Sequence, residues 1–139
     1  MTEAELLAGF EACTLPAASF PHREHVRLAW AYLRERPLLE ALERITHGIQ
    51  RFAAAHGHAG KYHATVTWAW VLLVHERLER GGRELAWEAF AAANEDLFAR
   101  GAEGPIARAY RPETLAGPLA RRVFVWPDRL VRADVGGGG

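Results

Sequence analysis

Residues 64–74 limit what this chain can fold into more than any other segment. These eleven residues are apolar apart from two threonines, and no charged residue interrupts them. A helix that is apolar on all sides belongs in the interior of a domain. Eleven residues are also too few to span a bilayer, which takes about 20. The sequence therefore predicts a buried central helix over about residues 61–80, with the other helices packed around it.

The rest of the chain is also dominated by helix signals. Thr2 and Glu5 have the spacing of a capping box, so a first helix is expected to run to about Cys13. Apolar residues at helical spacing, with prolines and glycines at the boundaries, predict further helices over residues 22–36, 38–56, 84–100, 105–110 and 112–120. Asn94 is expected to break the helix over residues 84–100 and to cap a second piece of it, and Gly117-Pro118 is expected to break the helix over residues 112–120.

These elements define the expected fold class. The segment 123–126 is β-prone but short, and Pro127 follows it. We expect an all-α, single-domain bundle of five or six helices over residues 1–135, with an irregular C-terminal segment. Residues 136–139 are all glycine and are expected to form a flexible tail.

The composition fits one compact domain and argues against several classes of partner. Half of the residues are hydrophobic, and 17 basic residues balance 17 acidic ones. This balance argues against nucleic-acid binding and against a polybasic membrane patch. Cys13 is the only cysteine, so neither an intrachain disulfide nor a thiolate metal cluster is expected. The N-terminus does not look like a signal peptide, so the expected location is cytoplasmic. The oligomeric state stays open, with a homodimer among the alternatives.

Three of the seven histidines are the sharpest candidates for a site. His22 and His25 continue the inward stripe of the second helix, and His63 is expected in the first turn of the apolar helix. The helix dipole disfavours a protonated imidazole there by up to about 1 kcal/mol, and burial acts in the same direction. Neutral imidazole is the form that binds metals. We therefore predict a divalent metal ion, zinc first of all, bound by His22, His25 and His63, with hydrogen-bonded structural histidines as the alternative.

Other residues are candidates to complete this site. Glu24, Tyr62 and Thr67 lie close to the histidines in sequence and are predicted as a general base or as groups that orient the metal ligands. Arg121 and Arg122 are predicted to hold an anionic group of a small-molecule substrate, with a surface salt bridge as the alternative. Whether His56 joins the site stays open, and the remaining histidines are expected to be exposed: His47, His58 and His75.

Several short motifs resemble those of a family of small uncharacterised bacterial helical proteins. They are Phe20-Pro21-His22-Arg23-Glu24-His25, the stretch 52–57, the stretch 61–68 with Lys61-Tyr62-His63 followed by Thr65, Thr67 and Trp68, the stretch 110–115 and the stretch 119–128. The resemblance extends over most of the chain. It implies a shared site but no particular reaction.

The predicted function is a metal-dependent hydrolase. Three imidazoles leave one position of a tetrahedral ion open for a water molecule, whose pKa the metal lowers to about 7 for attack on an ester or phosphoester. One alternative is a non-haem iron enzyme that uses oxygen, with Glu24 as the carboxylate ligand. The other alternative is a non-catalytic helical module that binds a small molecule or a metal.

Overall fold

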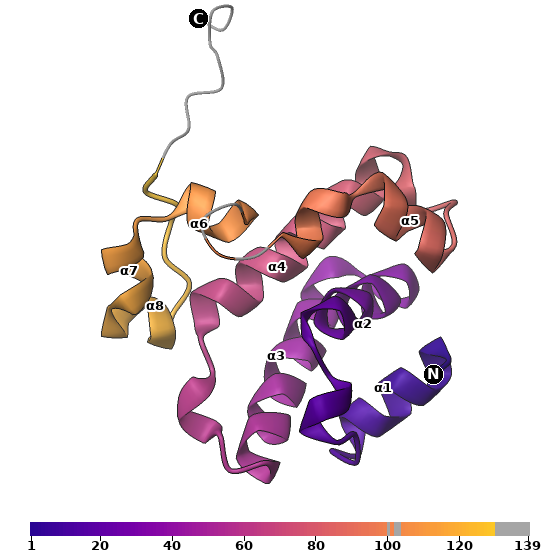
Figure 1. The fold of residues 1–139 in the computed structure, drawn as a ribbon, viewed down its shortest axis with the longest axis horizontal. Coiled ribbons are helices and arrows are strands. Elements are labelled where there is room, and N and C mark those ends of the chain that lie inside the picture. Colours follow the sequence, from indigo (N-terminus) through magenta and orange to yellow (C-terminus); the bar gives the residue numbers. More distant parts are fainter. Residues whose placement is uncertain (100, 102–103, 130–139) are drawn as a thin grey trace, which may run out of the picture.

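The computed structural model describes residues 1–99, 101 and 104–129, and these residues form eight α-helices and no β-strand (Figure 1). The helices are α1 (Glu3–Glu11), α2 (His22–Glu35), α3 (Leu38–Ala55), α4 (Ala64–Arg77), α5 (Trp87–Ala93), α6 (Pro105–Ala109), α7 (Pro112–Ala116) and α8 (Pro118–Arg122). The all-α prediction is confirmed. Five of the helices have seven or more residues, and the C-terminal ones are single short turns.

Local sequence signals set most helix boundaries. The predicted capping box is present, because the Glu5 backbone N–H donates to Thr2 Oγ1 at 3.0 Å and the Thr2 N–H donates to Glu5 Oε1 at 2.9 Å. The helix expected over 84–100 is interrupted at Asn94, whose side-chain amide donates to the Phe90 carbonyl at 2.9 Å. The chain then continues as a 3-10 turn, Glu95–Phe98.

The apolar helix α4 begins later than predicted. Lys61 lies in a separate 3-10 turn, Ala59–Lys61, and His63 is the N-cap residue of α4 instead of a residue of its first turn. At its other end α4 continues into a wider π-type turn, Leu78–Gly82. The shift in the starting point matters for the site, because it turns His63 from an inward-facing helical side chain into a capping group.

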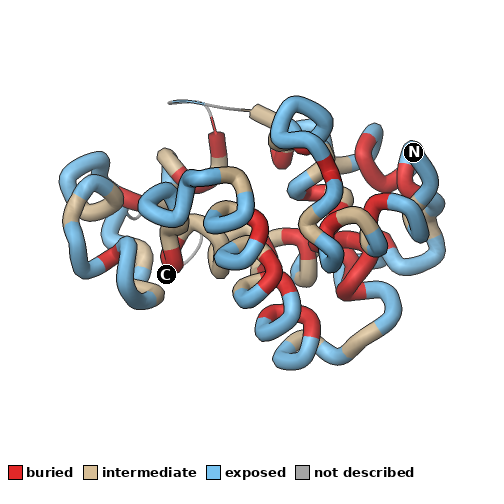
Figure 2. The backbone as a smooth tube through the Cα atoms, turned by 90° about the horizontal axis from the view of Figure 1, so that it is seen from below, coloured by how far each residue is buried: buried red, intermediate tan, exposed pale blue. Residues whose placement is uncertain are grey.

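The most buried helix is α2, not α4. Six consecutive residues of α2, 28–33, are buried, because α1, α3 and α4 all pack against it. In α4 only Ala64, Thr65, Val71 and Val74 are buried, and most of its other apolar side chains are partly exposed. The prediction of α4 as the fully buried centre is thus wrong in its extent. Figure 2 shows buried backbone concentrated in the half that holds the N-terminus.

The C-terminal part packs against α4 through polar contacts. Thr65, fully buried, donates from Oγ1 to the Val123 carbonyl at 2.9 Å and accepts from the Val125 N–H at 3.1 Å. Tyr110 donates to the Val125 carbonyl at 2.8 Å. The β-prone segment 123–126 has no partner strand in the described structure, and side chains instead bond three of its backbone groups, at Val123 and Val125. The predicted glycine tail, 136–139, lies outside the described residues.

No helix in the described ranges is both long and apolar enough to cross a membrane. This finding agrees with the prediction from the length of the apolar segment. It reflects the size of the individual helices, the longest of which is α3 with 18 residues, and the charged residues on their outer faces.

Gly48 of α3 provides a test of the packing of α1 on α3. An added Cβ would lie 2.3 Å from a ring carbon of Phe10. Alanine usually stabilises a helix relative to glycine by up to about 1 kcal/mol, but overpacking costs about 1 to 3 kcal/mol. We expect Gly48→Ala to lower the free energy of unfolding, measured by urea denaturation. Gly60→Ala is the control, because a Cβ there meets nothing within 4 Å; equal stabilisation by both substitutions would contradict the packing.

Candidate functional site

A cavity of about 370 Å³ lies between α2, α3, α4 and α6. It brings together five of the residues predicted from the sequence, which are His22, His25, Tyr62, His63 and Thr67. Its walls are otherwise largely aliphatic, with side chains of Ile45, Ile49, Val66, Val71 and Ile106, and one face is formed by Trp70. The predicted convergence of two helix starts is thus present as a cavity.

Both ring nitrogens of His63 are engaged in hydrogen bonds. Nδ1 accepts from the Val66 N–H at 3.1 Å, which caps the start of α4, and Nε2 lies 2.8 Å from the Leu115 carbonyl oxygen at the end of α7. A carbonyl only accepts, so Nε2 carries the proton and Nδ1 carries the lone pair that receives the backbone N–H. The ring is therefore neutral, and neither nitrogen is left with an unused lone pair.

Only one ring nitrogen of His22, Nε2, forms a hydrogen bond with the described residues. Its Nε2 lies 3.0 Å from the Leu97 carbonyl oxygen and must donate to it. The ring packs against Trp70, with centroids 4.6 Å apart. In the neutral ring, Nδ1 is then the acceptor nitrogen, and the described residues provide no partner for it. His22 is thus the histidine of the cavity that keeps a nitrogen available for a ligand.

His25 lies at the rim. The sequence predicted an inward position, but His25 is exposed, because the buried stretch of α2 begins one residue later at Val26. Its ring packs on Phe20 with centroids 4.1 Å apart. His25 therefore lines the cavity, as the predicted inward position implies. The expectation that it would be buried is wrong.

The side chains of the described residues do not fit a three-histidine metal site in this arrangement. No group of three or more His, Cys, Asp or Glu side chains in the described part of the chain is placed to hold a metal ion. Both ring nitrogens of His63, one of which would have to bind the metal, already form hydrogen bonds with Val66 and Leu115. A zinc ion at His22, His25 and His63 therefore stays a prediction from the sequence.

The predicted catalytic residues differ in their positions. Thr67 and Tyr62 line the cavity, whereas Glu24 does not, and its carboxylate lies 3.8 Å from the Arg27 guanidinium. Burial raises the pKa of Tyr62, partly opposed by a hydrogen bond with Thr46. A phenol with a raised pKa keeps its proton near neutral pH, so Tyr62 is suited to donate a hydrogen bond to a ligand and not to act as a base.

The two arginines predicted to bind substrate lie away from this cavity. Arg121 is exposed and donates to the Gly60 carbonyl at 3.1 Å, which ties α8 to the turn before α4. Arg122 is also exposed and lines a separate hollow with Trp68 and Phe124. Neither the cavity nor its histidines are contacted by these guanidinium groups in the described structure.

The sequence did not predict three residues that line the cavity, namely Lys61, Gly101 and Gly104. Lys61 had a signal, since it is the only lysine in the chain and lies two residues before His63. Gly101 and Gly104 had none, because a glycine has no side chain whose chemistry could be read from the sequence. Trp70 of the apolar helix α4 also lines the cavity.

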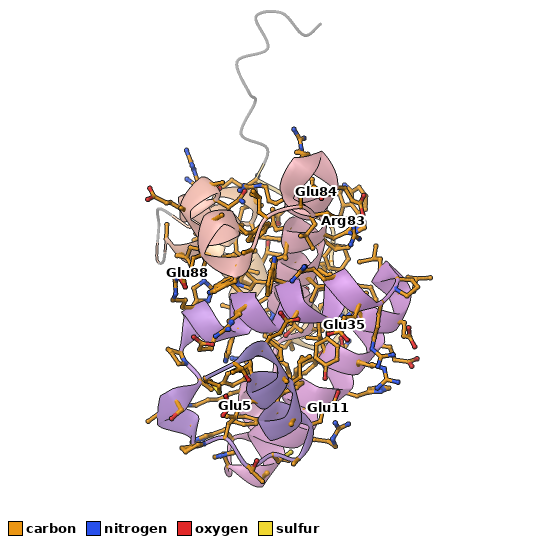
Figure 3. The ribbon with its side chains drawn as sticks, turned by 90° about the vertical axis from the view of Figure 1, so that its right-hand side faces the viewer. Glu5, Glu11, Glu35, Arg83, Glu84 and Glu88 are labelled. Atoms are coloured by element: carbon orange, nitrogen blue, oxygen red, sulfur yellow. The ribbon has the colours of Figure 1, made fainter. Side chains whose placement is uncertain are left out.

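The charge around the cavity is one-sided. Among the described lining residues there is no Asp or Glu, and Lys61 is the only residue that is permanently charged at neutral pH. Figure 3 labels five glutamates on α1, α2 and the segment around α5, namely Glu5, Glu11, Glu35, Glu84 and Glu88. Within the described lining, Lys61 therefore has no competing carboxylate.

The double role of His63 predicts graded effects of substitution. His63→Ala removes the cap and the Leu115 contact and should cost about 1 to 3 kcal/mol of unfolding free energy. His63→Asn keeps an N-cap acceptor but is too short to reach Leu115, so it should cost less. Urea denaturation measures both. His47→Ala, at an exposed position of α3, should be nearly neutral, and equal losses for Ala and Asn at position 63 would contradict the capping role.

The motifs that suggested a family resemblance have visible structural roles. Tyr110 and Thr65 hold the segment after α8, Thr114 donates to the Asp128 carboxylate, and Arg121 donates to Gly60. These contacts account for the specific residue types without reference to a reaction. Comparisons of the chain with protein-family models, with curated proteins and with solved structures found no match.

Proposed function

We propose that the cavity between α2, α3, α4 and α6 binds a small organic acid with a branched aliphatic body and a hydroxyl group, and that it does so without a metal ion. The observation that supports this proposal is that some polar groups lining the cavity are hydrogen-bonded within the protein, whereas others can still bind a ligand. Both ring nitrogens of His63 are used within the fold, whereas His22 keeps Nδ1, and the described residues that line the cavity place no carboxylate beside Lys61.

The polar groups suit a ligand that both donates and accepts. A ligand hydroxyl can donate to His22 Nδ1, and a ligand carboxylate can accept from the Lys61 ammonium. Tyr62, kept protonated by its burial, and Thr67 supply further hydroxyl donors at the same cavity. Charge-assisted hydrogen bonds of this kind are stronger than neutral ones, so the acid group is expected to dominate affinity.

The apolar walls limit the rest of the ligand. Ile45, Ile49 and Ile106 are branched aliphatic side chains, and Trp70 adds a flat apolar face. A volume of about 370 Å³ is at the small end of ligand pockets, which span about 300 to 1,000 Å³. Such walls favour a compact hydrocarbon group over a polar or extended one.

Of the three functions predicted from the sequence, we therefore favour the non-catalytic binding module over the metal-dependent hydrolase and the non-haem iron enzyme. A zinc hydrolase needs three ligand nitrogens and an iron oxygenase needs a carboxylate beside two histidines. Both His63 nitrogens have other partners, and Glu24 is not part of the cavity. Binding of a small acid requires only His22 Nδ1 and the Lys61 ammonium group, which do not have to hold a metal.

The test uses 2-hydroxy-4-methylpentanoate as the probe in isothermal titration calorimetry with chelator-treated protein. We expect it to bind about tenfold more tightly than 4-methylpentanoate and than its own amide, because each lacks a contact of about 1.4 kcal/mol. Ala107→Leu narrows the cavity and should abolish binding, whereas the control Ala116→Leu, on the exposed side of α7, should not.

Two results would contradict the proposal. One is equal affinity for the three compounds, since the recognition of acid and hydroxyl would then be absent. The other is binding that appears only after zinc is added, which would favour the metal site predicted from the sequence.

A further inference from the structure

A second cavity, of about 390 Å³, adjoins the first. His25, Ile49, Lys61 and Tyr62 line both cavities, but the remaining walls differ. The second cavity lies between the segment before α2, the C-terminal half of α3 and the turn Ala59–Lys61. None of the groups proposed to recognise a ligand in the first cavity, apart from Lys61 and Tyr62, belongs to it.

The floor of the second cavity is a continuous row of four rings. His25 packs on Phe20 with centroids 4.1 Å apart, Phe20 lies 5.0 Å from Phe52, and Phe52 stacks on His56 at 4.2 Å with an interplanar angle of 25°. Phe20 and Phe52 are buried, with Phe10 packed against both. The row is therefore rigid and presents aromatic faces and edges to the cavity.

The polar groups of this cavity are basic. His56 caps the C-terminus of α3, and its Nδ1 donates to the Phe52 carbonyl at 3.0 Å, which fixes the ring against Phe52. His58 and Lys61 are exposed at the rim. The described lining residues include no Asp or Glu. At this rim the described lining offers an anionic group imidazoles and one ammonium group.

We infer that this second cavity binds a flat aromatic carboxylate, with its ring against the row formed by His25, Phe20, Phe52 and His56 and its carboxylate at Lys61. Aromatic side chains prefer offset-stacked or edge-to-face partners, which a planar ring supplies and a saturated ring does not. The ammonium group of Lys61 supplies the charge contact.

This ligand class differs from the one proposed for the first cavity. The first cavity has mainly branched aliphatic walls, whereas the second has two phenylalanines and two ring-packed histidines. The two sites share Lys61, so an acid bound in one is expected to compete with an acid bound in the other for its ammonium group. The inference does not depend on the first cavity being a binding site.

The experiment measures binding of 2-naphthoate to the full chain by NMR titration and calorimetry. Two analogues separate the contributions, since 2-naphthamide keeps the ring without the charge and decalin-2-carboxylate keeps the charge without the aromatic plane. We expect 2-naphthoate to bind at least about tenfold more tightly than either, with the largest shifts at His56 and Phe52.

Substitutions in each cavity show which of the two binds 2-naphthoate. Ala53 lines the second cavity and Ala54, its neighbour, is exposed and does not. Ala53→Leu should abolish 2-naphthoate binding and Ala54→Leu should leave it intact, while Ala107→Leu, which narrows the first cavity, should have no effect on it. Equal affinity for the three compounds, or a loss of 2-naphthoate binding in Ala107→Leu but not in Ala53→Leu, would overturn the inference.

Discussion

The two hydrogen bonds of the His63 ring connect the start of α4 with the end of α7. Nδ1 accepts a hydrogen bond from the Val66 N–H and so caps the start of α4. Nε2 donates to the Leu115 carbonyl and so holds α7 against the start of α4. Two residues later, buried Thr65 fixes the extended segment after α8. Because an imidazole can accept at one nitrogen and donate at the other only when neutral, the fold itself requires the uncharged, Nε2-protonated ring.

This structural use of His63 decides what chemistry the cavity can offer. A histidine that caps a helix and ties down a second helix has no lone pair left for a metal, so the polar contribution of the cavity passes to His22 and Lys61. The chain as a whole is neutral, but its described carboxylates are kept out of both cavities. This local excess of basic groups among the described lining residues is the basis of both proposals, an aliphatic acid for one cavity and an aromatic acid for the other.

The sequence carries the fold class and part of the site, for physical reasons that differ. Caps and breaks such as Thr2, Asn94 and Gly117 act locally, so they can be read without tertiary information. The stripe of His22 and His25 also follows from helical spacing. The role of His63 could not be predicted, because its partner Leu115 is 52 residues away. The burial of α2 instead of α4 likewise depends on which helices pack around each, which hydrophobicity alone does not encode.

The most direct test is the protonation state of the His63 ring, read from the ¹⁵N chemical shifts of its two nitrogens in a long-range ¹H–¹⁵N NMR spectrum with and without excess zinc. The account predicts a neutral ring with the proton on Nε2, unchanged by zinc while the fold is intact. A proton on Nδ1, or a zinc-dependent shift of either nitrogen in the folded protein, would contradict it and favour the metal site.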